Sequence, residues 1–250
     1  MRHLGSNLYW AFFLFSLPVF FLGVLVLFAL TFPFDRNGRW VHLYSCFWGQ
    51  CYFYANPFWR ARFEGRNLLP WRGPAVLVAN HASIADILLL YGLYRPYKWV
   101  SKKSVFKLPF IGWNMRLNRY VGLERGNRQS ILKMVTECEH WLSRGVPVLL
   151  FPEGTRSEDG QVKEFKDGAF RLAINARCPV IPIVVMGTGQ LLPKHGYLLG
   201  NGYHCLAKVL PPIDPAPFGA DHEALRDHVR RLIIDEKARL ELAQASRSVN

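Results

Sequence analysis

The chain has 250 residues, which is enough for one large α/β domain with an appendage but too few for two full catalytic domains. Half of the residues are hydrophobic and 14% are aromatic, which excludes an intrinsically disordered chain. The formal net charge of +13 indicates an anionic partner such as an acidic lipid, a phosphorylated substrate, an acidic carrier protein or nucleic acid, although a solvated basic surface gives the same count.

The five cysteines are odd in number, widely spaced and without a Cys-x-x-Cys pair. This spacing argues against a disulfide framework and against a zinc site, and it favours a reducing compartment. Cys178 and Cys205 lie in apolar, strand-like runs, so we expect both to be small core residues.

An uncharged apolar run extends from Leu8 to Phe34 near the N-terminus. About 20 apolar residues are enough to cross a bilayer as a helix, so the run predicts a membrane anchor. It is too long for the apolar region of an ordinary signal peptide, and no A-x-A-like cleavage site follows it. Pro18 removes a backbone donor, so a kinked helix or a hairpin that enters one leaflet remains an alternative to a span.

A second uncharged segment, Val41 to Trp59, is rich in Tyr, Trp and Phe, which favour the level of the lipid headgroups. Only Arg2 precedes the two segments. Five arginines follow one or the other on the C-terminal side: Arg36, Arg39, Arg60, Arg62 and Arg66. By the positive-inside bias the body faces the cytoplasm at the inner membrane. We therefore predict membrane-anchoring helices within residues 1–62 and a separate body from 63 to 250; the alternative is a pair of helices buried in a soluble core.

The body alternates short apolar runs with amphipathic segments. Strands are predicted at Ala75–Ala79, Trp99–Ser101, Tyr120–Leu123, Pro147–Phe151, Val180–Met186 and Cys205–Leu210. Helices are predicted at Ile84–Leu93, Arg128–Arg144, Gly168–Asn175 and from Asp221, as N-cap, to about Ala243. This order predicts an α/β fold with a mostly parallel central sheet flanked by helices.

Two polar segments follow predicted strands, where α/β sheets gather their ligands. In NHASIAD, His81 and Asp86 are five residues apart, so they can meet only if the histidine lies in the strand-to-helix turn and the aspartate in the first helical turn. Asp86 would then fix the tautomer of a histidine base. In FPEGTRS a carboxylate and a glycine turn precede Arg156, whose planar fork suits phosphate; the alternative is a turn-capping Glu153 and a surface Arg156.

Between these segments, lysines alternate with apolar residues from Trp99 to Trp113, as expected of a surface that meets both a charged headgroup and an acyl chain. The chain shows no nucleophile elbow, P-loop or dinucleotide-binding glycine pattern.

Together, from about Pro74 to Pro182, these segments resemble the lysophosphatidic acid acyltransferase family (1-acylglycerol-3-phosphate O-acyltransferases). NHASIAD resembles its NHxxxxD signature, SKKSVFKLPFIGW its lysine-containing segment, RYVGLER its second block, FPEGTRS its EGTR block and CPVIPI its proline-containing strand. The chain has Arg119 where the family usually has glycine, Gly122 where it often has phenylalanine, and Cys178 in place of an aliphatic residue.

The resemblance implies transfer of a fatty acyl chain from a thioester, acyl-CoA or acyl-ACP, to the free hydroxyl of lysophosphatidic acid, giving phosphatidic acid. It implies His81 and Asp86 as catalytic residues and the acceptor-binding residues Lys102, Arg125, Glu153, Gly154, Thr155 and Arg156. It implies no metal or other cofactor, and partners that are a membrane lipid, the bilayer and the acyl donor rather than nucleic acid. The alternatives are a different acceptor (glycerol 3-phosphate, a lysophospholipid or an aminolipid) and a non-catalytic membrane-tethered binder of acidic lipid or nucleic acid.

Overall fold

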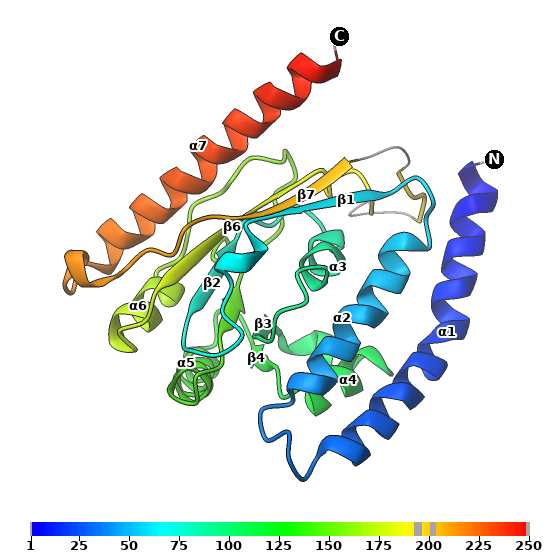
Figure 1. The fold of residues 1–250 in the computed structure, drawn as a ribbon, viewed down its shortest axis with the longest axis horizontal. Helices are drawn as coiled ribbons and strands as arrows, with labels where there is room; N and C mark the ends of the chain where they lie inside the picture. Colours follow the sequence, from blue (N-terminus) through cyan, green and yellow to red (C-terminus); the bar gives the residue numbers. More distant parts are fainter. Residues whose placement is uncertain (1, 193–196, 201–203, 249–250) are drawn as a thin grey trace.

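The computed structural model of the protein describes residues 2–192, 197–200 and 204–248. Its helices are α1 (Arg2–Thr31), α2 (Arg39–Tyr54), α3 (Ala85–Tyr91), α4 (Ile111–Leu117), α5 (Arg128–Ser143), α6 (Gly168–Asn175) and α7 (His222–Ser248) (Figure 1). Its strands are β1 (Arg60–Glu64), β2 (Val76–Ala79), β3 (Lys98–Lys102), β4 (Val121–Leu123), β5 (Val148–Leu150), β6 (Val180–Met186) and β7 (His204–Val209). Single 3-10 turns occupy Arg66–Leu68 (η1), Lys103–Lys107 (η2) and Ala216–Phe218 (η3).

The seven strands form one sheet in the order β1-β7-β6-β2-β5-β3-β4. Every neighbouring pair is parallel except β6 and β7, which confirms the predicted mostly parallel sheet. All residues of β2 and β6 are buried, because helices cover both faces of the sheet. This explains why these strands read as continuous apolar runs.

Alternate residues of each central strand pack in two different cores. Val76 and Val78 of β2 lie in one core with residues of α5, α6 and α7. Leu77 and Ala79 lie in the other core with residues of α2, α3 and the N-terminal part of α1. Cys178 and Cys205 are each 1% exposed, which confirms their prediction as core residues. The five cysteines are all free thiols.

The sequence analysis missed β1, which crosses the predicted boundary between residues 62 and 63. Exposed Arg60 begins a strand in which Ala61 and Phe63 are half-buried against the core, and the strand pairs in parallel with β7. Its charged residues sit at every second position, as expected of an edge strand. The sheet therefore begins at Arg60, inside the range assigned to the anchor.

Helices α1 and α2 form an antiparallel hairpin beside the body (Figure 1). Helix α1 is a single α-helix that continues through Pro18, so the alternative of a segment split at this residue is wrong. Leu17 and Val24 are buried against Trp48 and Tyr52 of α2. By length and composition α1 could cross a membrane, since its most apolar window has a mean hydropathy of 2.7 and only 17% of that window is buried.

The segment after β3 was also missed, because its lysines masked a helical period. Here η2 leads into the short helix α4, which packs on α1. The ring of Phe21 in α1 contacts the rings of Phe110 and Trp113, with centroids 5.8 and 5.5 Å away. Helix α1 is thus bound to the body near its middle as well as to α2.

Candidate active site

The predicted site residues gather at one edge of the sheet. Strands β2, β5, β3 and β4 are neighbours and all run in the same direction, so the loops that follow them share the carboxyl edge. His81 follows β2, Glu153 follows β5, Lys102 ends β3 and Arg125 follows β4. The topology therefore brings four separate sequence segments to one place.

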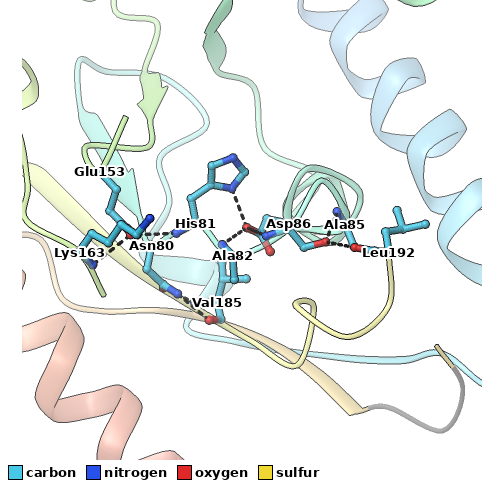
Figure 2. A network of polar contacts seen from close by, with 10 residues as sticks. Asn80, His81, Ala82, Ala85, Asp86, Glu153, Lys163, Val185 and Leu192 are labelled. Carbon is cyan, nitrogen blue, oxygen red and sulfur yellow. Dashed lines mark hydrogen bonds and ion pairs between the residues drawn. The ribbon is translucent and has the colours of Figure 1, made fainter. Parts of the chain in front are cut away.

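The His81–Asp86 pair has the predicted geometry. The Nδ1 atom of His81 lies 2.7 Å from Oδ2 of Asp86, whose side chain is fully buried (Figure 2). The same oxygen accepts the backbone N–H groups of Ala82 and Ser83 at 2.8 and 2.9 Å. Since Nδ1 donates to the carboxylate, Nε2 is the basic nitrogen, and it has no hydrogen-bond partner among the residues that the structure describes.

The turn that carries His81 is tied to the neighbouring strand by Asn80. Its side chain donates to Val185 O at 2.9 Å and accepts from Val185 N–H at 2.8 Å. Asn80 thereby extends the pairing of β2 with β6 by one residue while its backbone leaves the sheet. No role was predicted for Asn80, although it opens the NHASIAD segment; the signal in the sequence was an amide side chain directly after a predicted strand.

Two aromatic rings fix the plane of the imidazole. The ring of Phe151 stacks on His81 with centroids 4.0 Å apart and an angle of 13° between the planes. Phe151 in turn stacks on Trp99 of β3 at 5.7 Å. Because Asp86 sets one direction of the ring and Phe151 its plane, the free Nε2 has a defined direction at the sheet edge.

Glu153 is a positioning residue in this arrangement. Its Oε1 accepts the backbone N–H of His81 at 2.7 Å, and its Oε2 accepts that of Lys163 at 3.1 Å (Figure 2). The residue is only 4% exposed, and burial raises the pKa of its carboxyl group, while the two backbone bonds act in the opposite direction. Since both oxygens are engaged by the backbone, the structure favours the ordering role over contact with an acceptor hydroxyl.

The rest of the EGTR block forms a tight turn beside the histidine. Gly154 has φ +71°, and a Cβ atom there would lie 3.1 Å from Cε of Lys166. Ser157 N–H donates to His81 O at 2.8 Å, which joins this turn to the histidine turn.

The other two predicted residues of the EGTR block differ in exposure. Thr155 is exposed, whereas Arg156 is partly buried and its backbone oxygen accepts from Nζ of Lys163 at 3.0 Å.

Lys102 and Arg125 lie at the same edge but do not contact the His81–Asp86 pair. Both side chains are exposed, and Lys102 is paired in register with Leu123 of β4, two residues before Arg125. The neighbouring Lys103 and Glu124 form an exposed ion pair at 3.5 Å. Lys102 and Arg125 thus share the carboxyl edge with the dyad, on two strands that β5 separates from β2, and their assignment to the acceptor stays a prediction.

The departures in the second block have structural explanations. Arg119 has φ +54°, in the left-handed region that favours glycine, and its guanidinium donates to Arg36 O at 2.8 Å. At Gly122 the ring of Phe106 lies 3.6 Å from the place that a Cβ atom would take. An aromatic ring is therefore present at this position, supplied by η2 instead of β4.

Comparison with known proteins identifies the class. The family model described as Acyltransferase matches residues 60–186, a range that starts with β1 and contains both polar segments. A 1-acyl-sn-glycerol-3-phosphate acyltransferase of Escherichia coli is 33% identical over 178 residues, covering 70% of this chain and 71% of that protein. The chain belongs to the acyltransferase family.

Two further relatives extend the comparison. A 1-acyl-sn-glycerol-3-phosphate acyltransferase of Chlamydomonas reinhardtii is 44% identical over 205 residues, covering 80% of this chain and 61% of that protein. The chain therefore spans 61% of the length of the algal relative, and it spans 58% of the length of a chloroplastic 1-acyl-sn-glycerol-3-phosphate acyltransferase of Brassica napus. The crystal structure of the 1-acyl-sn-glycerophosphate acyltransferase PlsC from Thermotoga maritima matches with a TM-score of 0.78 and 29% identity, covering 96% of this chain and 98% of that one. This match confirms the predicted fold class.

Proposed function

We propose that the protein transfers a fatty acyl chain from an acyl thioester to the free hydroxyl of lysophosphatidic acid, giving phosphatidic acid. One observation carries the proposal: the basic Nε2 of His81 is free, while Nδ1 is bound to a buried carboxylate at 2.7 Å. A protein that only binds lipid has no use for an oriented base of this kind. The names of the E. coli and algal relatives support lysophosphatidic acid as the acceptor.

In the proposed reaction His81 removes the hydroxyl proton as the acceptor oxygen attacks the thioester carbonyl. Asp86 stabilises the imidazolium that forms, because its Oδ2 already accepts from Nδ1. The tetrahedral intermediate then expels the thiolate, which takes up the proton, and the new ester bond is complete. Thiolate is a good leaving group, so this transfer needs no metal ion or prosthetic group and no covalent enzyme intermediate.

The acceptor phosphate would be held by three cations, Lys102 at the end of β3, Arg125 after β4 and Arg156 after β5. The guanidinium of Arg156 makes no hydrogen bond or ion pair within the part of the chain that the structure describes, so its fork is open to a ligand. Glu153 holds the turn that sets His81 relative to this loop. The acyl donor, acyl-CoA or acyl-ACP, is part of the same proposal, and the activity assay decides between them.

We further propose that α1 and α2 lie within one leaflet at the cytoplasmic side of the membrane. The body holds the N-terminal part of α1: Trp10 Nε1 donates to Tyr197 O at 2.7 Å, and Ser6 Oγ accepts from Leu199 N–H at 3.0 Å. Beyond the other end, Nζ of Lys98 donates to Asn37 O at 2.7 Å. A helix bound to the body along its length cannot cross a bilayer without drawing polar strands and loops into hydrocarbon.

This topology can be tested by labelling the two ends of α1. In a Cys51→Ser background, single cysteines at His3 and at Arg36 should both react with an impermeant maleimide from the cytoplasmic side. Labelling of the two positions from opposite sides would show that α1 spans the bilayer. The other native cysteines are buried and should give a low background.

The activity is tested with purified protein and a panel of acceptors. Lysophosphatidic acid, other lysophospholipids, glycerol 3-phosphate and an aminolipid are each incubated with acyl-CoA or acyl-ACP, and products are identified by mass. We expect phosphatidic acid as the main product and none from His81→Ala. If another acceptor gives the main product, the acceptor assignment fails while the reaction class stands. Consumption of no thioester with any acceptor would favour the non-catalytic binder.

A further inference from the structure

A second charged pocket lies at the opposite edge of the sheet. It has a volume of about 430 Å³ and forms where the connection between α1 and α2 meets the loops that lead into β2 and β5. Arg72 precedes β2 and Arg144 precedes β5, while Arg36 and Arg39 come from the connection and the start of α2. Because β2 and β5 are parallel, this is the amino edge, and the candidate active site lies at the other end of the same strands. We call it the arginine pocket.

The arginine pocket has an excess of positive charge. Its walls hold four guanidinium groups and one carboxylate, Asp35. Asp35 Oδ2 accepts the backbone N–H of Trp40 at 2.7 Å. The side chains of Arg36, Arg39 and Arg72 have no hydrogen bond or ion pair with any residue that the structure describes. A bound anion would relieve the repulsion among these groups, and the planar guanidinium fork matches phosphate oxygens.

Part of the arginine pocket is held in place before any ligand binds. Asn37 Oδ1 accepts from Nε and Nη2 of Arg144 at 3.0 and 2.8 Å. The backbone oxygen of Asn37 accepts from the buried Nζ of Lys98, which also donates to Asn118 O at 2.6 Å. Asn37 therefore joins the α1–α2 connection to β3 and to the loop before β5. Such fixed cations lower the conformational cost of binding.

The rim of the pocket favours a lipid over a soluble anion. Phe34 is 78% exposed and Trp40 is 58% exposed, and both line the pocket. They continue the exposed apolar side of α1, whose last turn and following residue present Leu30 and Phe32 to solvent. Aromatic rings next to arginines are typical of the headgroup level of a bilayer. A phospholipid can place its phosphate among the arginines and its chains along α1, whereas free phosphate leaves the apolar rim exposed.

We propose that the arginine pocket binds the phosphate of an anionic membrane phospholipid at a site separate from the active site. Bound there, the lipid holds the α1–α2 connection at the membrane surface. The carboxyl edge of the sheet is then oriented by a contact made at the amino edge. None of the pocket residues belongs to the catalytic or acceptor-binding set, so the proposal does not depend on the acceptor specificity.

The test compares two triple variants with the same change in charge. R36Q/R39Q/R72Q removes the three unpaired cations of the pocket and keeps Arg144, which bonds Asn37. The control R171Q/R177Q/R231Q removes three exposed arginines: one in α6, one two residues after the end of α6, and one in α7. Co-sedimentation of each full-length protein is measured with phosphatidylcholine vesicles that contain or lack phosphatidylglycerol, and again with inorganic phosphate as competitor at constant ionic strength.

We expect the pocket variant to bind phosphatidylglycerol vesicles at least tenfold more weakly than wild type, since each arginine near an anionic surface contributes about fivefold. The control variant should bind within about threefold of wild type, and neither variant should change activity toward a detergent-dispersed acceptor. An equal loss of vesicle binding in the two variants would show that binding depends only on the overall charge of the protein. That result would overturn the proposed site. Displacement of wild type, but not of the pocket variant, from the vesicles by inorganic phosphate would support binding of the lipid phosphate in the pocket. Equal binding of the pocket variant and wild type to phosphatidylglycerol vesicles would overturn the lipid assignment.

Discussion

The two edges of the sheet carry different chemistry on the same strands. At the carboxyl edge an imidazole is fixed by a buried carboxylate and a stacked ring, and cations lie on neighbouring loops. At the amino edge the arginine pocket has guanidinium groups and exposed rings, and none of the described residues that line it carries an imidazole, thiol or hydroxyl group. Both edges can attract phosphate, but the carboxyl edge presents an imidazole with one nitrogen free, whereas both nitrogens of His42 near the amino edge are hydrogen-bonded. A group of cations is enough to bind phosphate, whereas catalysis also requires a base that is held in a defined orientation.

The largest effect should come from removing the base. His81→Ala should lower kcat by about a thousandfold, since general base catalysis contributes roughly 10²- to 10⁴-fold. The melting temperature and vesicle binding should stay close to wild type, because the imidazole stacks on Phe151 and bonds Asp86 at the edge of the sheet rather than in either hydrophobic core. The measurement is steady-state turnover of a labelled acyl thioester. Turnover near the wild-type rate would remove His81 from the mechanism.

A somewhat smaller loss is expected for Asp86→Asn. The amide can still accept the N–H groups of Ala82 and Ser83, but it no longer stabilises the imidazolium, so kcat should fall by about a hundredfold. Circular dichroism should show an unchanged fold, which separates a catalytic effect from collapse of the turn. A rate within twofold of wild type would contradict the role of the dyad.

Near the amino edge we expect an effect of acid pH on the free energy of unfolding rather than an effect on substrate turnover. Burial, and secondarily the charge of Lys98, lower the pKa of His42 from 6.5 to about 3. The unfolded chain takes up this proton near pH 6.5 and the native chain does not, so the free energy of unfolding falls as the pH falls between these values. We expect a loss on the order of 2 kcal/mol by about pH 4.5, measured by denaturant unfolding.

The matched control for this effect is His42→Gln. His42 accepts from Tyr120 Oη at 2.7 Å and donates to Arg95 O at 3.0 Å, and a glutamine side chain offers one acceptor and one donor. The variant should be less stable at neutral pH and should lose less stability on acidification. An equally steep decline in the variant would assign the acid sensitivity to other groups.

Single arginines at the two edges should separate acceptor binding from membrane docking. Arg156→Ala should raise the acceptor KM by about tenfold, as expected for the loss of a charge-assisted contact, and change the thioester KM less. Arg72→Ala, at the amino edge, should leave both constants unchanged with a detergent-dispersed acceptor. Steady-state kinetics with each substrate varied in turn provide the measurement. Identical behaviour of the two variants would remove the distinction between the edges.

The smallest effect is expected at Arg119, beside the α1–α2 connection. Glycine relieves the left-handed backbone but loses the bond to Arg36 O, so Arg119→Gly should change the free energy of unfolding by less than about 1 kcal/mol. Arg119→Val places a β-branched side chain at φ +54° and should cost about 1 kcal/mol or more. A larger loss for glycine than for valine, by thermal unfolding, would contradict the strain that we assign to the left-handed backbone at this position.

Much of the fold could be predicted from the hydrophobic periodicity and the composition of the sequence. Buried strands such as β6 read as continuous apolar runs, and α6 begins and ends at the predicted residues. Strand β1 was missed because its charged residues and edge position hide a short alternating pattern. Helix α4 was missed because its packing on Phe21 comes from a segment about 90 positions earlier, which local patterns do not register.

The candidate site was predictable where its geometry is local. The five-residue spacing of His81 and Asp86 predicted their contact, and the structure confirms it. The ordering bond from Glu153 to the backbone of His81 joins residues 72 positions apart, and no pattern in either segment specifies that atom pair. The arginine pocket was also not predicted, because Arg36 and Arg144 meet only through folding of the whole sheet. Sequence patterns therefore gave the base and its orienting group, but not their long-range supports.

The compactness of the histidine turn has a consequence for how such a chain can diversify. Imidazole, carboxylate and the two backbone amides that bind it all lie within six consecutive residues. The cations that would select the acceptor come from three other segments, at the end of β3 and in the loops after β4 and β5. The preference for an acceptor can thus change through substitutions in those segments, while the turn from His81 to Asp86 keeps the same sequence and geometry.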